Sequence, residues 1–365
     1  FLALTQTDIP FVVSVESDMD WLNHLRKWNC IVDNEKSNRL CFLHVNIGKT
    51  GDWGVPTEMD KKDLFPNYSM APFATDKKTK FDAIFIDHYL TRNVDERDAG
   101  SNKGASLCSE FRVCCPDVPI FGISAAREDQ LSLNERSEYD FFATATEYRN
   151  SILIDMVKSA VAGFRQLKQL VKSDSVHGDE DFIDIVLRQF EVPSDDSSLM
   201  KKILPSCLSV REKFNIHMAF QWVLKKFLKK DGILIGSKTI AAMIGLKEEP
   251  FMEKIKPKLH DCHYRGLFAF GDDTFWRSKV FAVLANLTGN DGSMPLSHYC
   301  TKLDGVEDED CATCIKCGEK YTELLAYEDR SPTAKAYPVH YKCSIEVEEG
   351  QSLFFDSEYL VKESN

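Results

Sequence analysis

The stretch that decides the fold expected for the first part of this chain is Phe81-Asp-Ala-Ile-Phe-Ile-Asp87. A short apolar run bounded by aspartates is typical of a buried strand in a parallel sheet, and Asp87 then lies at the carboxyl end of that strand. A helix is expected from Gly104, and the next strand is expected over residues 119–124. Because ligands bind outside the carboxyl ends of such strands, Asp87 and Ser124 are candidate site residues.

Further strands and helices are expected on both sides of this stretch. Apolar runs predict strands over residues 10–16, 41–47 and 140–144, and a helical apolar spacing covers residues 151–171. Strands that alternate with helices indicate a parallel sheet with right-handed crossovers. The sequence therefore predicts an α/β domain with five parallel strands.

The composition limits the class of protein. A chain of 365 residues predicts two or three domains. It has no apolar run of about 18 residues and no basic, apolar start of the secretory kind, so we expect a cytoplasmic protein that does not cross a membrane. The 12 cysteines are scattered through a long chain and cluster only near its end, which favours a reducing compartment with a local metal site.

Charge is unevenly distributed along the chain. Residues 201–290 carry a net charge of +8, whereas residues 1–200 carry −11 and residues 291–365 carry −9. Such local fields decide which partners a region attracts. Together with the patterns of the elements, they suggest four parts: an α/β domain over 1–172, an acidic linker over 173–205, a basic domain over 206–290 and a C-terminal module over 291–365.

A resemblance to a known family rests on three stretches. They are Val15-Glu16-Ser17-Asp18, the strand that ends at Asp87, and Pro116-Asp-Val-Pro-Ile-Phe-Gly-Ile-Ser-Ala125. Together they resemble the receiver domain of two-component response regulators. The resemblance implies a flavodoxin-like, five-stranded parallel sheet for residues 1–172.

The family resemblance also implies roles for individual residues. Asp87 would be the phosphoacceptor, Ser124 the switch hydroxyl, and Glu16 and Asp18 would bind Mg²⁺ together with Asp87. A cluster of carboxylates suits this hard cation, whose charge offsets that of an incoming phosphoryl group. The implied partner is a histidine kinase or another signalling protein.

Two positions depart from the family pattern. Ser17 stands where the family has a second acid, and Thr144 stands where it has a lysine at the end of the fifth strand. Without that ammonium group, one cation that would bind phosphoryl oxygens is missing. Two interpretations therefore stay open: a phosphorylatable receiver, and a pseudo-receiver that serves docking or homodimer formation.

The basic domain has the order of elements of a winged helix. A helix is expected over residues 209–230, two more over 237–246 and 249–264, and a hairpin around Gly271. Basic residues on the second of these two helices and on the hairpin are candidate contacts to double-stranded DNA: Lys254, Lys256, Lys258, Arg277 and Lys279. Protein is the alternative partner for such a domain.

The most specific chemical signal lies near the end of the chain. Cys314-Ile-Lys-Cys317 and His340-Tyr-Lys-Cys343 supply two ligand pairs with the same internal spacing. Four such ligands suit tetrahedral Zn²⁺ and leave no open position, which predicts a structural site. Cys311 forms a second CxxC with Cys314 and is an alternate ligand, and Cys300 and His298 are further alternates.

These patterns predict a signalling or regulatory protein with an output that binds DNA or protein. A first alternative is an adaptor that docks proteins only. A second is a component of a nucleic-acid-processing or defence enzyme system. The sequence offers no convincing nucleophile–base pair, phosphate-binding loop or open metal site, so Asp87 is expected to accept a phosphoryl group rather than catalyse a reaction.

Overall fold

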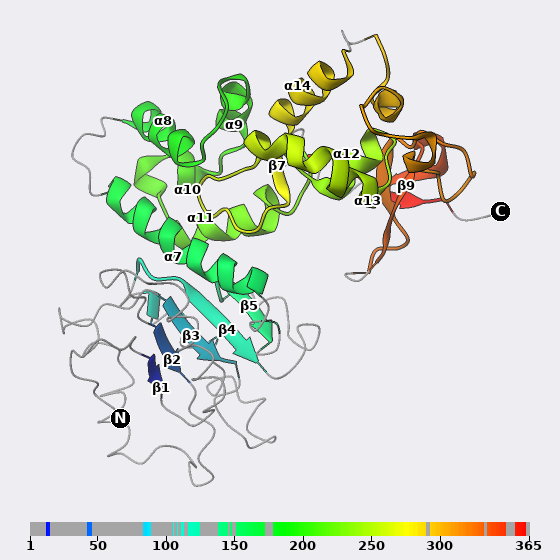
Figure 1. Ribbon diagram of the computed structural model, residues 1–365. Coiled ribbons are helices and arrows are strands. Elements are labelled where there is room, and N and C mark those ends of the chain that lie inside the picture. The colour runs from blue at the N-terminus through cyan, green and yellow to red at the C-terminus, as the bar shows by residue number, and fades with distance from the viewer. Residues whose placement is uncertain are drawn as a thin grey trace, which may run out of the picture. The chain divides into compact units, whose positions relative to one another are not determined.

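The computed structural model describes part of the first half of the chain and most of the second half (Figure 1). The described residues are 12–14, 42–45, 83–88, 105, 108, 111–112, 116–124, 138–144, 147, 151–171, 178–289, 293–331, 334–347 and 355–362. The chain divides into two compact units. The first unit comprises residues 1–175 and 215–221, and the second comprises residues 176–214 and 222–365.

A parallel sheet forms the centre of the first unit. Its strands are β1 (Val12–Ser14), β2 (Phe42–Val45), β3 (Ala83–Asp87), β4 (Ile120–Ser124) and β5 (Phe141–Thr144). They pair in the order β1-β2-β3-β4-β5, so each strand lies next to its neighbours in the sequence. Figure 1 shows this succession from dark blue to cyan.

This strand order corrects the expected fold class. In a flavodoxin-like sheet the first strand lies between the second and the third, and ligands bind where the order reverses. Here β2 lies between β1 and β3, with Val45 opposite Ile86. The prediction of a flavodoxin-like sheet is therefore wrong. Apolar runs reveal that a strand exists, but the order depends on the direction in which each crossover turns, which no local pattern records.

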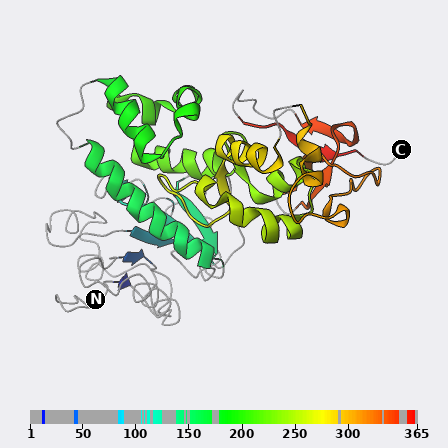
Figure 2. The same ribbon diagram turned by 45° about the horizontal axis from the view of Figure 1, so that its top comes forward.

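The core of the first unit lies between this sheet and helix α7 (Ser151–Val171). Ile84, Phe85 and Phe121 are completely buried, and the rings of Phe85 and Phe121 stack with their centroids 5.1 Å apart. Helix α7 lies next to β4 and β5 in Figures 1 and 2 and buries a stripe of apolar side chains at helical spacing: Met156, Val157, Ala160, Val161, Phe164 and Leu167. The expected helix over 151–171 is thus present.

Residues 215–221 also belong to the first unit, although residues 176–214, which precede them, belong to the second unit. They include most of helix α11 (Ile216–Trp222). Phe220 contacts Phe164 edge to face, with ring centroids 5.6 Å apart, so α11 adds apolar surface beside α7. None of the helices in the described parts of the chain has the length and apolar content needed to cross a bilayer.

The second unit is built mainly from short helices. They are α8 (Asp179–Gln189), α9 (Ser197–Ile203), α10 (Ser206–Ser209), α12 (Ser237–Met243), α13 (Glu248–Pro250) and α14 (Arg277–Thr288). A π-helical turn follows α11 over Val223–Phe227, and another follows α13 over Phe251–Ile255. Aromatic side chains fill the space between them, since the ring of Tyr264 lies 5.5 Å from those of both Phe227 and Trp276.

The winged-helix part of the predicted fold is also wrong. The expected hairpin around Gly271 is absent from the described chain, because β7 (Thr274–Trp276) pairs instead with β6 (Leu234–Gly236). The chain then enters α14, whose Val280 and Leu284 are buried one helical turn apart. The apolar residues after Thr274 are compatible with a strand or a helix. The helix buries Val280 and Leu284 on the same face, which favours it over the strand.

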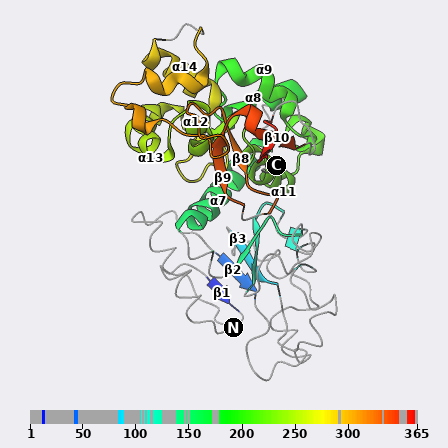
Figure 3. The same ribbon diagram turned by 90° about the vertical axis from the view of Figure 1, so that its right-hand side faces the viewer.

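A mixed four-stranded sheet lies near the C-terminus. Its strands are β8 (Leu324–Tyr327), β9 (Ala336–Val339), β10 (Ser344–Val347) and β11 (Glu358–Val361). They pair in the order β10-β11-β8-β9, and only β11 and β8 are parallel. Figure 3 shows α12 next to β8 and β9, and Thr322 donates a hydrogen bond to the Ala242 carbonyl of α12 (3.0 Å).

Candidate metal centre

Four cysteine and histidine side chains converge beside the C-terminal sheet. Cys314 and Cys317 lie on a tight turn before β8. His340 directly precedes, and Cys343 ends, the 3₁₀ turn between β9 and β10. Their ligand atoms all lie within 4.8 Å of one another. Gly318 has a φ of 73° and donates its backbone N–H to the Cys314 carbonyl (2.9 Å), which closes the turn beneath the thiols. This cluster could hold a metal ion.

The orientation of His340 fits a ligand. Its Nδ1 lies 3.4 Å from Cys317 Sγ, and its Nε2 lies 3.0 Å from the carbonyl oxygen of Lys320. Because a carbonyl only accepts, Nε2 carries the proton and the lone pair of Nδ1 faces the thiols. Hydrogen bonds of this kind fix the tautomer of metal-binding histidines.

The thiols of the cluster differ in acidity. Burial raises the pKa of Cys314, but the backbone N–H groups of Cys317, His340 and Lys316 more than offset this and lower it to about 6. Burial and hydrogen bonds with Cys317 and Cys314 raise the pKa of the Cys343 thiol to about 11. The Cys314 thiolate is thus stabilised mainly by backbone N–H groups, whereas Cys343 needs a bound cation to lose its proton at neutral pH.

The alternate ligands lie elsewhere. The Sγ atoms of Cys311 and Cys300 are 3.1 Å apart in the helical core, and Cys311 is not among the clustered ligands. The His298 ring stacks on Tyr321, with ring centroids 4.6 Å apart. The spacing of the cysteines left this choice open, because Cys311 and Cys314 have the same separation as Cys314 and Cys317.

The candidate phosphoacceptor lies at the carboxyl edge of the parallel sheet. Asp87 ends β3 opposite Ile123, and Ser124 ends β4 opposite Thr144. Glu16 and Asp18 lie outside the described residues; they follow β1, which β2 separates from β3.

A carboxylate, not an ammonium group, lies at the end of β5. Glu147 Oε2 accepts hydrogen bonds from the backbone N–H of Thr144 (2.6 Å) and from its hydroxyl (2.8 Å). Thr144 Oγ1 in turn accepts the backbone N–H of Glu147 (3.2 Å), which forms a reciprocal capping pair. A carboxylate group therefore lies next to Thr144, the position where the receiver family has a lysine.

No family model matches this chain, and no curated protein matches its sequence.

Carboxylates neutralise several of the candidate DNA contacts. The ion pairs are Lys254 with Asp310 (2.6 Å), Lys256 with Asp272 and Asp273 (3.5 and 3.6 Å), and Arg277 with Asp356 (2.7 Å). Lys258 and Lys279 form no ion pair within the described parts of the chain. Arg277 and Lys279, which were expected on the hairpin, lie in the first turn of α14. Lys256 and Lys258, which were expected on the recognition helix, lie in a 3₁₀ helix.

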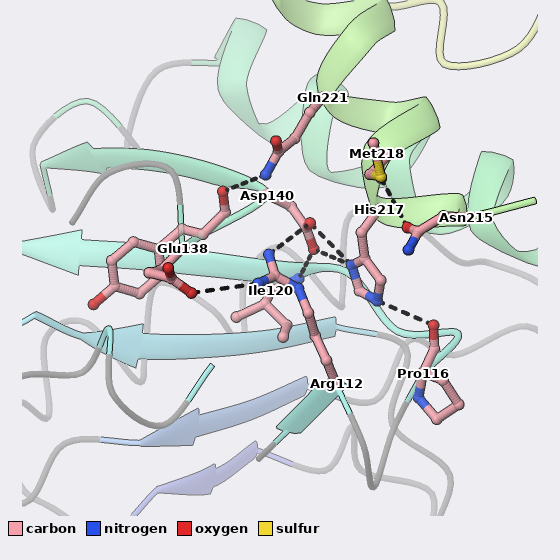
Figure 4. Close-up of polar contacts among 10 residues, drawn as sticks. Arg112, Pro116, Ile120, Glu138, Asp140, Asn215, His217, Met218 and Gln221 are labelled. Atoms are coloured by element: carbon pink, nitrogen blue, oxygen red, sulfur yellow. Dashed lines mark hydrogen bonds and ion pairs between the residues drawn. The ribbon is translucent and has the colours of Figure 1, made fainter. Parts of the chain in front are cut away.

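A buried polar cluster that the sequence did not reveal joins α11 to the parallel sheet (Figure 4). Both oxygens of Asp140 lie within 2.9 Å of His217 Nδ1, and Oδ2 also accepts the backbone N–H of Ile120 (2.7 Å). Arg112 Nη2 lies 3.4 Å from Oδ1 of the same carboxylate. The partners are 77 residues apart in the sequence, and no local pattern links them.

This cluster does not have the features of a catalytic site. His217 Nε2 lies 3.0 Å from the carbonyl oxygen of Pro116, and Nδ1 faces the carboxylate. Both nitrogens therefore meet acceptors, and the ring makes all of these bonds only when both nitrogens carry protons. An imidazole engaged in this way cannot accept a proton from a substrate. The cluster instead fixes residues 215–221 to β5 and to the loop before β4.

Proposed function

We propose that this protein is a zinc-containing regulatory adaptor that binds other proteins and does not catalyse a reaction. The observation that carries the proposal is the closed set of four ligands in Cys314, Cys317, His340 and Cys343. Catalytic zinc sites keep one position open for water or substrate, whereas structural sites use four protein ligands. A metal held in this way stabilises a small module instead of activating a substrate.

Zinc suits the ligands and their spacing. Three thiolates and one imidazole favour zinc over hard cations, which prefer oxygen ligands. In a tetrahedral site with Zn–S bonds of about 2.3 Å, the ligand atoms lie about 3.8 Å apart. The present spread of 4.8 Å needs only a small contraction around the ion.

The distribution of charge supports protein partners over DNA. Lys254, Lys256 and Arg277 have carboxylate neighbours, so DNA phosphates would have to displace existing ion pairs. Counterion release, which drives most non-specific DNA binding, requires cations that are free to neutralise phosphates. The net charge of +8 in residues 201–290 is therefore a poor guide to the field that a partner meets.

Exposed apolar side chains support a docking role for the zinc module. Ile315 and Tyr341 directly follow the ligands Cys314 and His340, and they are 55% and 56% exposed. Because the ligand atoms lie close together, the two turns that carry Ile315 and Tyr341 are neighbours at the metal site. Large apolar and aromatic side chains are the usual anchors of protein interfaces.

The proposal is tested by binding partners in the presence and absence of these anchors. The 365-residue chain, purified without chelators, is used to capture partners from extracts of its own cells, and the variant Ile315→Ser/Tyr341→Ser is used in parallel. We expect one zinc per chain in both proteins and loss of the captured partners only in the variant. Identical partners for both proteins would contradict docking at these turns.

A gel-shift series at increasing salt distinguishes the DNA-binding alternative. We expect no complex with double-stranded DNA at physiological salt. A complex that weakens steeply with salt, and that is lost in Lys258→Ala/Lys279→Ala, would favour the DNA-binding regulator over the adaptor.

A further inference from the structure

Two cysteines outside the metal cluster face each other in the core of the second unit. Cys300 and Cys311 have their Sγ atoms 3.1 Å apart, and both side chains are at least 98% buried. They share a buried apolar core with Ile244 and Leu246. The two thiols therefore form a separate pair, apart from the ligands of the metal centre.

One turn of the backbone holds both cysteines in place. The N–H of Cys300 donates to the carbonyl of Ile244 (3.1 Å), while Cys311 bridges to Leu246 and the next N–H, of Ala312, donates to Gly245 (2.8 Å). The turn that joins α12 to α13 thus lies against both thiol-bearing segments. Because these backbone hydrogen bonds already hold the two thiols close together, bond formation loses little conformational entropy.

We propose that Cys300 and Cys311 form a reversible disulfide when the protein meets an oxidising small-molecule disulfide such as oxidised glutathione. The sulfur atoms need to approach by about 1 Å to reach the bond length of about 2.05 Å. One cysteine attacks the small disulfide, forms a mixed disulfide and releases one thiol. The second cysteine displaces the remaining small thiol. The protein loses two protons and two electrons, and both end on the two released thiols.

The disulfide would act on the segment that leads into the metal centre. Cys311 lies three residues before Cys314, and the new bond would close the loop from Cys300 and fasten its end to the α12–α13 turn. None of the four clustered ligands takes part, so metal binding and disulfide formation are compatible. The second unit would then gain stability on oxidation without exchange of its metal.

Burial determines how fast the bond forms. Desolvation, followed by the hydrogen bond with Cys311, raises the pKa of the Cys300 thiol well above its usual value. Attack requires a thiolate, so the oxidant reacts when the segment opens locally. We expect the rate of oxidation to level off as the concentration of oxidised glutathione rises, because opening then limits it.

The disulfide is identified by mass spectrometry of the zinc-loaded, 365-residue chain. The protein is incubated with oxidised glutathione, alkylated and digested with trypsin. Cleavage after Lys302 separates the Cys300 peptide from the peptide that contains both Cys311 and Cys314, and fragmentation assigns the linked residue. We expect a Cys300–Cys311 link that dithiothreitol removes, with zinc retained. The absence of this link, or a link from Cys300 to Cys314, overturns the proposal.

Matched variants separate the disulfide from general effects of serine substitution. Cys300→Ser and Cys311→Ser should each abolish the rise in melting temperature caused by oxidised glutathione. Cys207→Ser removes another buried cysteine of the same unit and should keep that rise. An equal rise in Cys300→Ser would overturn the proposal. If a serine variant does not fold, Cys300→Ala serves in its place, and the linked peptide in the wild-type chain still decides.

Discussion

At the level of single residues, a substitution of Cys317 tests the effect of the metal on stability separately from the effect of packing. It is exposed, whereas the other three members of the cluster are buried. Replacing it with serine therefore removes a ligand with little loss of packing. Loss of a group that only hydrogen-bonds a metal ligand typically weakens metal binding by roughly 10–100-fold. Because Cys317 is itself a candidate ligand, we expect Cys317→Ser to weaken zinc binding by a larger factor.

Metal content and thermal unfolding of Cys317→Ser check this prediction. Cys207→Ser is the control, because it removes a thiol outside the cluster. Full zinc occupancy of Cys317→Ser under competition with a chelator would show that the thiol is not a ligand.

The ion pair of His217 and Asp140 gives a second prediction for single residues. Removing one partner of a buried, hydrogen-bonded pair costs about 3–5 kcal/mol, since the other charge stays in the protein interior. Arg112 and the N–H of Ile120 also contact Asp140, so we expect His217→Ala to cost about 3 kcal/mol. Urea unfolding of the wild type, both single variants and His217→Ala/Asp140→Asn measures the coupling. A coupling free energy near zero would contradict the role of this pair.

At the scale of the element, the turn between α12 and α13 depends on Gly245. Its φ is 71°, and a Cβ there would lie 2.1 Å from the carbonyl oxygen of Ser297. Gly271 has a φ of 69°, but a Cβ there meets no atom within 4 Å. Gly271→Ala therefore measures backbone strain alone, about 1 kcal/mol. We expect Gly245→Ala to be clearly more destabilising, as measured by urea unfolding; equal losses would contradict the close approach.

The order of the strands gives a prediction for Asp87. The strand before Glu16 and Asp18 does not adjoin β3, and Glu147 puts a carboxylate at the end of β5. We therefore expect no acyl phosphate when the protein is treated with acetyl phosphate and Mg²⁺. Intact mass compares the wild type with Asp87→Asn. A phosphoryl adduct in the wild type alone would restore the phosphoacceptor.

Individual elements could be predicted from the sequence better than their arrangement. The apolar runs around Asp87 and Ser124 predicted strands, because a strand that is buried on both faces has a nearly continuous run of apolar residues. The two CxxC-like pairs likewise predicted a metal site, since ligand spacing is itself local. Strand order, the pairing of β6 with β7 and the partnership of His217 with Asp140 depend on residues far apart in the sequence. These features were therefore missed.

At the scale of the whole molecule, the metal should stabilise one unit only. All four clustered ligands belong to the second unit, whose C-terminal sheet has a small core around Leu324, Ala326 and Val339. We expect a chelator to lower the melting temperature of this unit and to expose the amides of β8–β11 to hydrogen exchange. The amides of β3–β5 serve as the internal control. Equal exchange in both units after chelation would contradict a local role for the metal.

Ion pairs within the second unit offset part of the segregation of charge along the chain. Asp310 and Asp356, from the acidic C-terminal region, neutralise Lys254 and Arg277 from the basic region. Sequence alone gives the net charge of a segment, but the field at the surface depends on which charges meet after folding.

Residues 215–221 also have a consequence for how the protein is made. Asp140 leaves the ribosome 77 residues before His217. At synthesis rates of about 5–20 residues per second, the wait for its partner lasts roughly 4–15 s. During that interval the sheet can assemble, but a carboxylate destined for its interior has no imidazole beside it. A nascent chain that ends after residue 175 would lack this partner however long it waited.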